Sequence, residues 1–326
     1  MIDYSICRDG GVRMRFHHIR RLHVWAVVTT GLLLIAVAFP QQWTGTLTSA
    51  RMRFASAGRA FAQSPEAPAR LEWLGWQFFR LTSPGGKIIL FNPSLNDPKA
   101  AFVNRESPLN LEQIDRVDLI LISSGHADDQ GMAAEISQKT GAPIITTFEL
   151  ANWLVAKGVA SDKILRGEPG SRFDVGGIKV QVVNSVHGSG APSLPGSLPS
   201  AVYGGPALGF IVTLETGLKI YHAGSTALTQ DLKLYAQLYK PHVALLPIAS
   251  GLMPDEAALA AEFLLTDNPN LHSVFPQHHA SFLPPELRGD VFVKEVAARR
   301  ALAGRVKAFN PQPGQMFLIT TRETKG

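Results

Sequence analysis

Residues 123–131 hold the side chains of this sequence that are best suited to chemistry. They read Ser-Ser-Gly-His-Ala-Asp-Asp-Gln-Gly and follow residues 117–122, a run that is apolar except for Asp118 and is typical of a buried strand. One imidazole, His126, and two carboxylates, Asp128 and Asp129, therefore come directly after a rigid element. Imidazole and carboxylate groups bind Zn, Fe or Mn, and a carboxylate beside a polarised water acts as a general base.

Two further histidines also follow expected strands. His187 comes after residues 178–183, and His278 comes after residues 273–275. A single histidine in a loop is more often a hydrogen-bonded structural residue than a ligand. Three strands that each lead into a histidine are the arrangement expected when a fold gathers ligands at one edge.

The elements around these residues form two groups of strands with helices between them, which predicts two packed sheets with helices outside. The segment 188–206, rich in Gly, Ser and Pro, predicts a loop that either covers the site or lies in solvent. The expected strands are 71–81, 87–91, 117–122, 144–147, 178–183, 208–214, 218–221, 243–246, 273–275 and 316–319, and the expected helices are 131–139, 148–157, 254–265 and 291–301.

Several stretches between residues 71 and 319 resemble, in the same order, the metallo-β-lactamase superfamily. They are similar above all to its metal-dependent hydrolases related to ascorbate-6-phosphate lactonase. The resemblance implies an α/β fold, the αβ/βα four-layer sandwich of two mixed sheets flanked by helices. The stretches are LEWLGW (71–76), ILFNP (89–93), IYHAGST (220–226), LLPI (245–248), MPDEA (253–257) and FPQHH (275–279), together with 123–131 at the family's His-x-His-x-Asp-His motif.

The resemblance also implies a metal-ligand set. Family members hold one ion at positions 124, 126 and 187 and a second at 128, 129 and 278, with a carboxylate at 225 bridging them. In this chain Ser124, Asp129 and Ser225 replace two imidazoles and the bridge. Asn92 and Trp76 also stand where the family has Asp and His.

Two interpretations follow, and the sequence leaves both open. In the first, the protein is a metal-dependent hydrolase of esters, lactones or phosphodiesters, with a reduced or single-metal site and a metal-bound water of lowered pKa. In the second, the metal site is extinct, no metal cofactor is bound, and the domain binds a small molecule or a protein partner. The expected metal ligands are His126, Asp128, Asp129, His187 and His278, with Asp128 and Asp129 catalytic and His222, Ser225 and His279 contacting substrate; Zn is the expected ion, with Fe or Mn as alternatives.

Charge and the N-terminal segment bear on partners and localisation. Residues 1–62 carry eight Arg and two acidic residues, so the net charge of +5 becomes about −1 for the remainder, and no nucleic-acid partner is expected. Arg13, Arg15, Arg20 and Arg21 precede a short apolar run, residues 24–39. This pattern predicts a signal peptide or N-terminal membrane anchor over 1–40, a linker over 41–68 and the domain over 69–326. We therefore expect an exported protein, periplasmic or anchored in the inner membrane and facing the periplasm. The single cysteine, Cys7, lies in the leader, so the domain has no disulfide.

Overall fold

The computed structural model describes residues 67–192 and 201–326. The predicted leader, and the linker up to residue 66, lie outside the described residues. Within the described part, no helix has both the length and the apolar character needed to cross a membrane.

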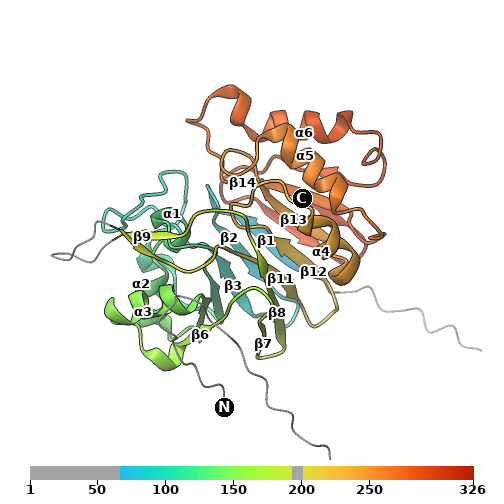
Figure 1. Cartoon of the computed structure of the whole chain (residues 1–326). Helices are drawn as coiled ribbons and strands as arrows, with labels where there is room; N and C mark the ends of the chain where they lie inside the picture. The colour runs from blue at the N-terminus through green and yellow to red at the C-terminus, as the bar shows by residue number, and fades with distance from the viewer. Residues whose placement is uncertain (1–66, 193–200) are drawn as a thin grey trace, which may run out of the picture. The chain divides into compact units, whose positions relative to one another are not determined.

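Two large mixed sheets form the centre of the described fold (Figure 1). Among the described residues the first sheet has eight strands, in the order β17 (Thr324–Lys325), β16 (Met316–Ile319), β1 (Ala69–Trp73), β2 (Phe79–Thr82), β3 (Ile88–Phe91), β4 (Leu119–Leu121), β5 (Ile144–Thr146) and β6 (Ile164–Arg166). The second has seven described strands, in the order β15 (Lys307–Ala308), β14 (Ser273–Gln277), β13 (Val243–Pro247), β12 (Lys219–His222), β11 (Leu208–Thr213), β8 (Ile178–Asn184) and β7 (Arg172–Val175). A separate pair joins β9 (Gly190–Pro192) to β10 (Ala201–Tyr203) inside the segment predicted as a loop.

Helices flank both sheets. The α-helices are α1 (Ala127–Gln130), α2 (Ala133–Thr140), α3 (Phe148–Ala156), α4 (Asp231–Tyr239), α5 (Pro254–Phe263) and α6 (Gly289–Ala298), and the short 3₁₀ helices are η1 (Leu111–Gln113), η2 (Ser161–Lys163) and η3 (Pro285–Leu287). Figure 1 shows α2 and α3 beside the first sheet and α4, α5 and α6 beside the second.

Three apolar clusters join these layers. One lies between the two sheets and includes Leu71, Phe91, Phe210 and Phe275. A second packs α4, α5 and α6 on the second sheet, and a third packs α2 and α3 on the first. Strands β4 and β13 are buried along their whole length, as strands covered on both faces must be. The predicted αβ/βα four-layer sandwich is confirmed.

Some predicted boundaries are wrong, and the errors lie near the motif. The predicted strand 71–81 is two strands, because the chain turns between β1 and β2 at Gly75 (φ 89°) and Trp76 (φ 56°). The predicted helix 131–139 begins at Ala133, after the separate one-turn helix α1. Helix α4 was not predicted.

Gly131 fixes α1 against the end of β3. Its backbone (φ 51°, ψ −125°) lies in a region that only glycine adopts without strain. A Cβ atom at this position would lie 2.1 Å from the carbonyl oxygen of Pro93, which also accepts a hydrogen bond from the amide of Met132 at 3.0 Å. This close backbone approach sets the position of the helix that carries Asp128 and Asp129.

We predict that Gly131→Ala destabilises the fold by more than the ~1–3 kcal/mol of backbone strain alone, because the new methyl group meets backbone atoms. Gly217→Ala is the matched control: Gly217 also has a positive φ (83°), but a Cβ there meets nothing within 4 Å. Urea denaturation monitored by circular dichroism measures both variants. If both variants lost the same free energy of unfolding, the contact with Pro93 would not constrain α1.

Candidate functional site

The residues expected to do chemistry come together at one edge of the described fold. Ser123 and α1 follow β4, His187 follows β8, Ser225 follows β12 and His278 follows β14. Contacts across these loops join the groups: His278 Nε2 lies 3.2 Å from Asp128 Oδ2, and the rings of His126 and His187 meet edge to face with centroids 5.0 Å apart. The expectation that these strand ends share an edge agrees with this geometry.

Three nitrogen atoms surround one oxygen of Asp128. Trp76 Nε1 donates to Oδ2 at 2.8 Å, Gln77 Nε2 donates to it at 3.0 Å, and His278 Nε2 lies at 3.2 Å. Trp76 and His278 are also tied through the backbone, since the His278 amide donates to the Trp76 carbonyl at 3.0 Å. The oxygen is therefore enclosed by N–H groups of neighbouring strand ends.

Asp129 is buried and bound in the same way. Asn92 Nδ2 donates to its Oδ1 at 2.9 Å, and the hydroxyl of Ser124 donates to its Oδ2. Asn92 is itself held by the amide of Ser123, which donates to Asn92 Oδ1 at 2.9 Å. Each carboxylate of the motif thus already has its hydrogen-bond donors within the protein.

The surroundings push the pKa values of the two carboxyl groups apart. Burial acts to raise the pKa of Asp128, but the hydrogen bond and charge of His278, together with the indole N–H of Trp76, outweigh it and hold that pKa well below the usual value. Burial, and then the charge of Asp128, raise the pKa of Asp129 to about 7. One carboxyl group is therefore ionised at neutral pH while its neighbour is substantially protonated.

The rings of His126 and His187, unlike the two carboxylates, have no hydrogen-bond partner among the described residues. Both residues are partly exposed. Burial, and then the nearby His126, lower the pKa of His187 below its usual value. This imidazole is neutral at pH 7 and offers both a donor and an acceptor to a ligand.

The three expected substrate-contacting residues lie deeper. His222 is fully buried, stacks on Phe91 with ring centroids 5.0 Å apart, and has its pKa lowered to about 3 by burial. His279 is buried against Trp73 at 4.5 Å, and burial, then His278, lower its pKa to about 4. Ser225 donates to Gln77 Oε1 at 3.2 Å. Both imidazoles thus pack on core aromatic rings, and the Ser225 side chain contacts the Gln77 side chain of the hydrogen-bond network.

Gln77 is the residue that sequence reasoning missed. It joins Asp128 and Ser225, yet it lies within the stretch predicted as a continuous strand. Backbone strain marks the same place: Trp76 (φ 56°), Asn92 (φ 45°) and His278 (φ 55°) are three of the five described non-glycine residues with positive φ. Such conformations cost about 1–3 kcal/mol each and gather at functional sites. The Gly75-Trp76 dipeptide was the available signal for the turn.

The donor set does not fit the paired-metal centre that the motif implies. Within residues 67–192 and 201–326, no three His, Cys, Asp or Glu side chains are arranged to hold a metal ion. At two implied ligand positions, the Ser124 hydroxyl donates a hydrogen bond to Asp129 and the Ser225 hydroxyl donates one to Gln77. N–H groups of Trp76 and Gln77 point at Asp128, where a cation would have to lie.

Comparisons with known proteins identify the family. The family described as "Beta-lactamase superfamily domain" matches residues 87–273. A "UPF0173 metal-dependent hydrolase" of Rubrobacter xylanophilus is 37% identical over 65% of this chain and 82% of its own length, and one of Methanopyrus kandleri is 35% identical over 76% and 99%. This chain belongs to the UPF0173 family of the beta-lactamase superfamily.

A solved structure supports the same conclusion for the fold of this UPF0173 member. The metallo hydrolase Igni18 of Ignicoccus hospitalis superimposes with a TM-score of 0.62 at 26% identity, covering 78% of this chain and 99% of that one. The predicted superfamily is confirmed. The relatives carry the name of metal-dependent hydrolases.

We predict that Asp129→Asn makes the protein more stable at pH 8 and changes its stability little at pH 4. The folded-state pKa of about 7 lies above the ordinary 3.8, so the contribution of Asp129 is full below pH 3.8 and is lost as the pH rises through 7. The slope is at most about 1.4 kcal/mol per pH unit. The amide keeps an acceptor for Asn92 and places a donor beside Ser124.

Urea denaturation of both proteins in EDTA, between pH 4 and pH 8, measures this difference. Asp129→Leu is the control, because it removes the acceptor to which Asn92 Nδ2 and the Ser124 hydroxyl donate, and it is expected to destabilise at every pH. A difference between Asp129→Asn and the parent that stays constant with pH would refute the raised pKa.

Proposed function

We propose that this UPF0173 member is a metal-free binding protein, in which the edge formed by α1 and the strand ends holds a small molecule. Paired-metal hydrolysis, the activity implied by the motif, is not its function in this proposal. The observation that carries the proposal is that Trp76, Gln77 and His278 all contact one oxygen of Asp128, Oδ2. A divalent cation that binds this oxygen would have to displace the N–H groups that donate to it, because their hydrogen atoms carry partial positive charge and would repel the cation.

The side chains around the carboxylates suit a ligand with a flat apolar part and a polar group. Trp76 stacks on Phe282 with ring centroids 5.8 Å apart and an interplanar angle of 12°, and it contacts Phe102 at 5.4 Å. Phe282 is 65% exposed, which is unusual for a large aromatic side chain. Stacking on this aromatic group, with hydrogen bonds from His126 and His187, is the expected mode of binding.

A second candidate is hydrolysis with one ion, and the His126–His187 contact favours it. The two partly exposed imidazoles would hold a Zn, Fe or Mn ion, which would supply a bound water of lowered pKa. Catalytic zinc sites use three protein ligands, and within the described residues these two histidines have no third. For this reason we place it second.

We predict that Zn²⁺, Mn²⁺ and Fe²⁺ leave the melting temperature of the protein unchanged relative to EDTA. The restored variant Ser124→His/Asp129→His/Ser225→Asp regains the implied ligand set, so metal at 100 times its dissociation constant should stabilise it by about 2.7 kcal/mol. Calorimetric melting and elemental analysis of the purified protein measure both effects.

Adding His126→Ala to the restored variant is the control, and it should remove the metal response. If the parent protein itself binds one ion per chain, and His187→Ala abolishes that binding, the single-ion hydrolase replaces the metal-free proposal. This arm needs only the parent protein and does not depend on the restored variant folding.

We also predict that a panel of small aromatic acids and alcohols, screened by thermal shift in EDTA, contains ligands that depend on Phe282 and His187. Phe282→Ala and His187→Ala should each weaken binding of the same hit about tenfold, since a stacked ring or a hydrogen bond contributes ~1 kcal/mol or more. Leu238→Ala removes a side chain of similar exposure (61%) from α4 and should have no effect. The binding role would be contradicted if no compound bound, or if Phe282→Ala and His187→Ala both left the affinity of every bound compound unchanged.

A further inference from the structure

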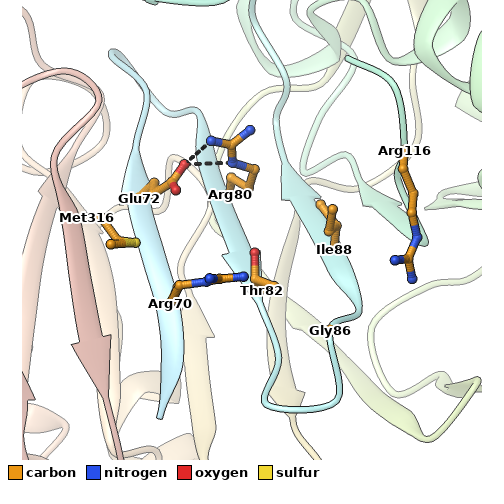
Figure 2. Close-up of a pocket in the computed structure, with 8 residues that line it drawn as sticks. All are labelled: Arg70, Glu72, Arg80, Thr82, Gly86, Ile88, Arg116 and Met316. Carbon is orange, nitrogen blue, oxygen red and sulfur yellow. Dashed lines mark hydrogen bonds and ion pairs between the residues drawn. The ribbon is translucent and has the colours of Figure 1, made fainter. Parts of the chain in front are cut away.

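A pocket of about 400 Å³ lies on the outer face of the first sheet, where strands β16, β1, β2 and β3 run side by side. Successive strand residues point to opposite faces, so Leu71 and Leu81 enter the core while their neighbours Arg70, Arg80 and Thr82 face outward. Figure 2 shows these outward side chains together with Arg116, which comes from the segment before β4.

The guanidinium groups of Arg70, Arg80 and Arg116 line this pocket, and only some of them are paired with a carboxylate. Arg80 Nε donates to Glu72 Oε2 at 2.6 Å. Arg116 Nη2 donates to Asp118 Oδ2 at 3.0 Å, but the Arg116 side chain is still 61% exposed. Arg70 is exposed and has no hydrogen bond or ion pair within the described residues, although it sits across from Thr82. In Figure 2 its guanidinium lies beside the Thr82 side chain.

The local charge balance is positive. Lys87 adds a fourth cation and shares Asp118 with Arg116, at 3.1 Å. Glu72 and Asp118 are the carboxylates paired with these cations, so four cations face two carboxylates. The domain as a whole carries no such excess, since residues after 62 sum to about −1. The cations are therefore concentrated here and not spread over a basic surface.

The pocket also has an apolar side. Ile88 and Met316 line it, and Met316 is 46% exposed although it is a large hydrophobic residue. Leu318, on the same outward face of β16 and 41% exposed, extends the apolar strip along that strand. An anion that also carries a short apolar part would contact both halves of the pocket.

We propose that this pocket binds a phosphate group carried by an organic ligand. Guanidinium groups pair with phosphate oxygens through two parallel N–H bonds, and a tetrahedral dianion accepts from several directions at once. In Figure 2 the Arg80 guanidinium is turned to Glu72 and that of Arg70 lies beside Thr82, while Arg116 lies on the far side of Ile88, so guanidinium groups stand on two sides of the pocket. The site is separate from the Asp128 edge and does not depend on the function proposed for that edge.

Isothermal titration calorimetry of the full chain with glycerol 3-phosphate tests a soluble phosphomonoester. Sedimentation with vesicles of phosphatidic acid in phosphatidylcholine tests the same phosphomonoester group on a lipid. We expect binding in at least one arm, weaker at high salt, with Arg70→Gln and Arg116→Gln each lowering affinity about tenfold or more. Arg70→Lys, which keeps the charge but not the two-pronged geometry, should give an intermediate loss.

Arg172→Gln is the matched control, because Arg172 is an exposed arginine of β7 that donates to Gln181 at 2.7 Å. It should bind as the parent does, and an unchanged melting temperature for Arg70→Gln excludes misfolding, since Arg70 has no partner to lose. Absence of binding in both arms overturns the proposal. Binding that Arg70→Gln and Arg116→Gln leave intact, or that Arg172→Gln weakens equally, overturns it as well.

Discussion

Two carboxyl groups adjacent in sequence, on a one-turn helix at the end of a buried strand, need positive charge, protons or hydrogen-bond donors around them. Burying an unpaired charge is among the most costly arrangements in a protein. In this chain donors meet that need: Trp76 and Gln77 contact Asp128, and Asn92 and Ser124 contact Asp129. The pKa values of the two groups diverge because the His278 and Trp76 contacts outweigh burial at Asp128, whereas burial and the charge of Asp128 prevail at Asp129.

The positions at which the chain departs from the implied metal motif are also those that form this network. Ser124 donates to Asp129, Ser225 donates to Gln77, and Asn92 bridges the end of β3 to Asp129. These three side chains therefore have hydrogen-bond partners inside the network, whereas the buried His278 Nδ1 and His222 Nε2 beside it have none among the described residues. In our proposal these substitutions together replace metal ions by hydrogen-bond donors. The positive-φ backbone at Trp76, Asn92 and His278 directs the donors towards the carboxylates.

The sequence predicted the sandwich and the edge, because buried strands leave long apolar runs and the ordered stretches resemble a known family. It could not predict Gln77, since a polar residue between Trp76 and Phe78 looks like an outward position on a strand until the turn at Gly75 is known. That the rings of His222 and His279 lie on Phe91 and Trp73 could not be predicted either, because sequence does not reveal stacking partners. Helix α4 was not predicted from the sequence.

The central claim of our proposal is that hydrogen-bond donors occupy the space in which the implied metal ions would lie, and anomalous diffraction measures this directly. Crystals grown with excess zinc, with data collected on both sides of the zinc absorption edge, should show no anomalous peak between Asp128 and His278 and none beside His126 and His187. Trp76 and Gln77 should still contact Asp128. A peak within about 2.0–2.2 Å of any of these side chains would contradict the account.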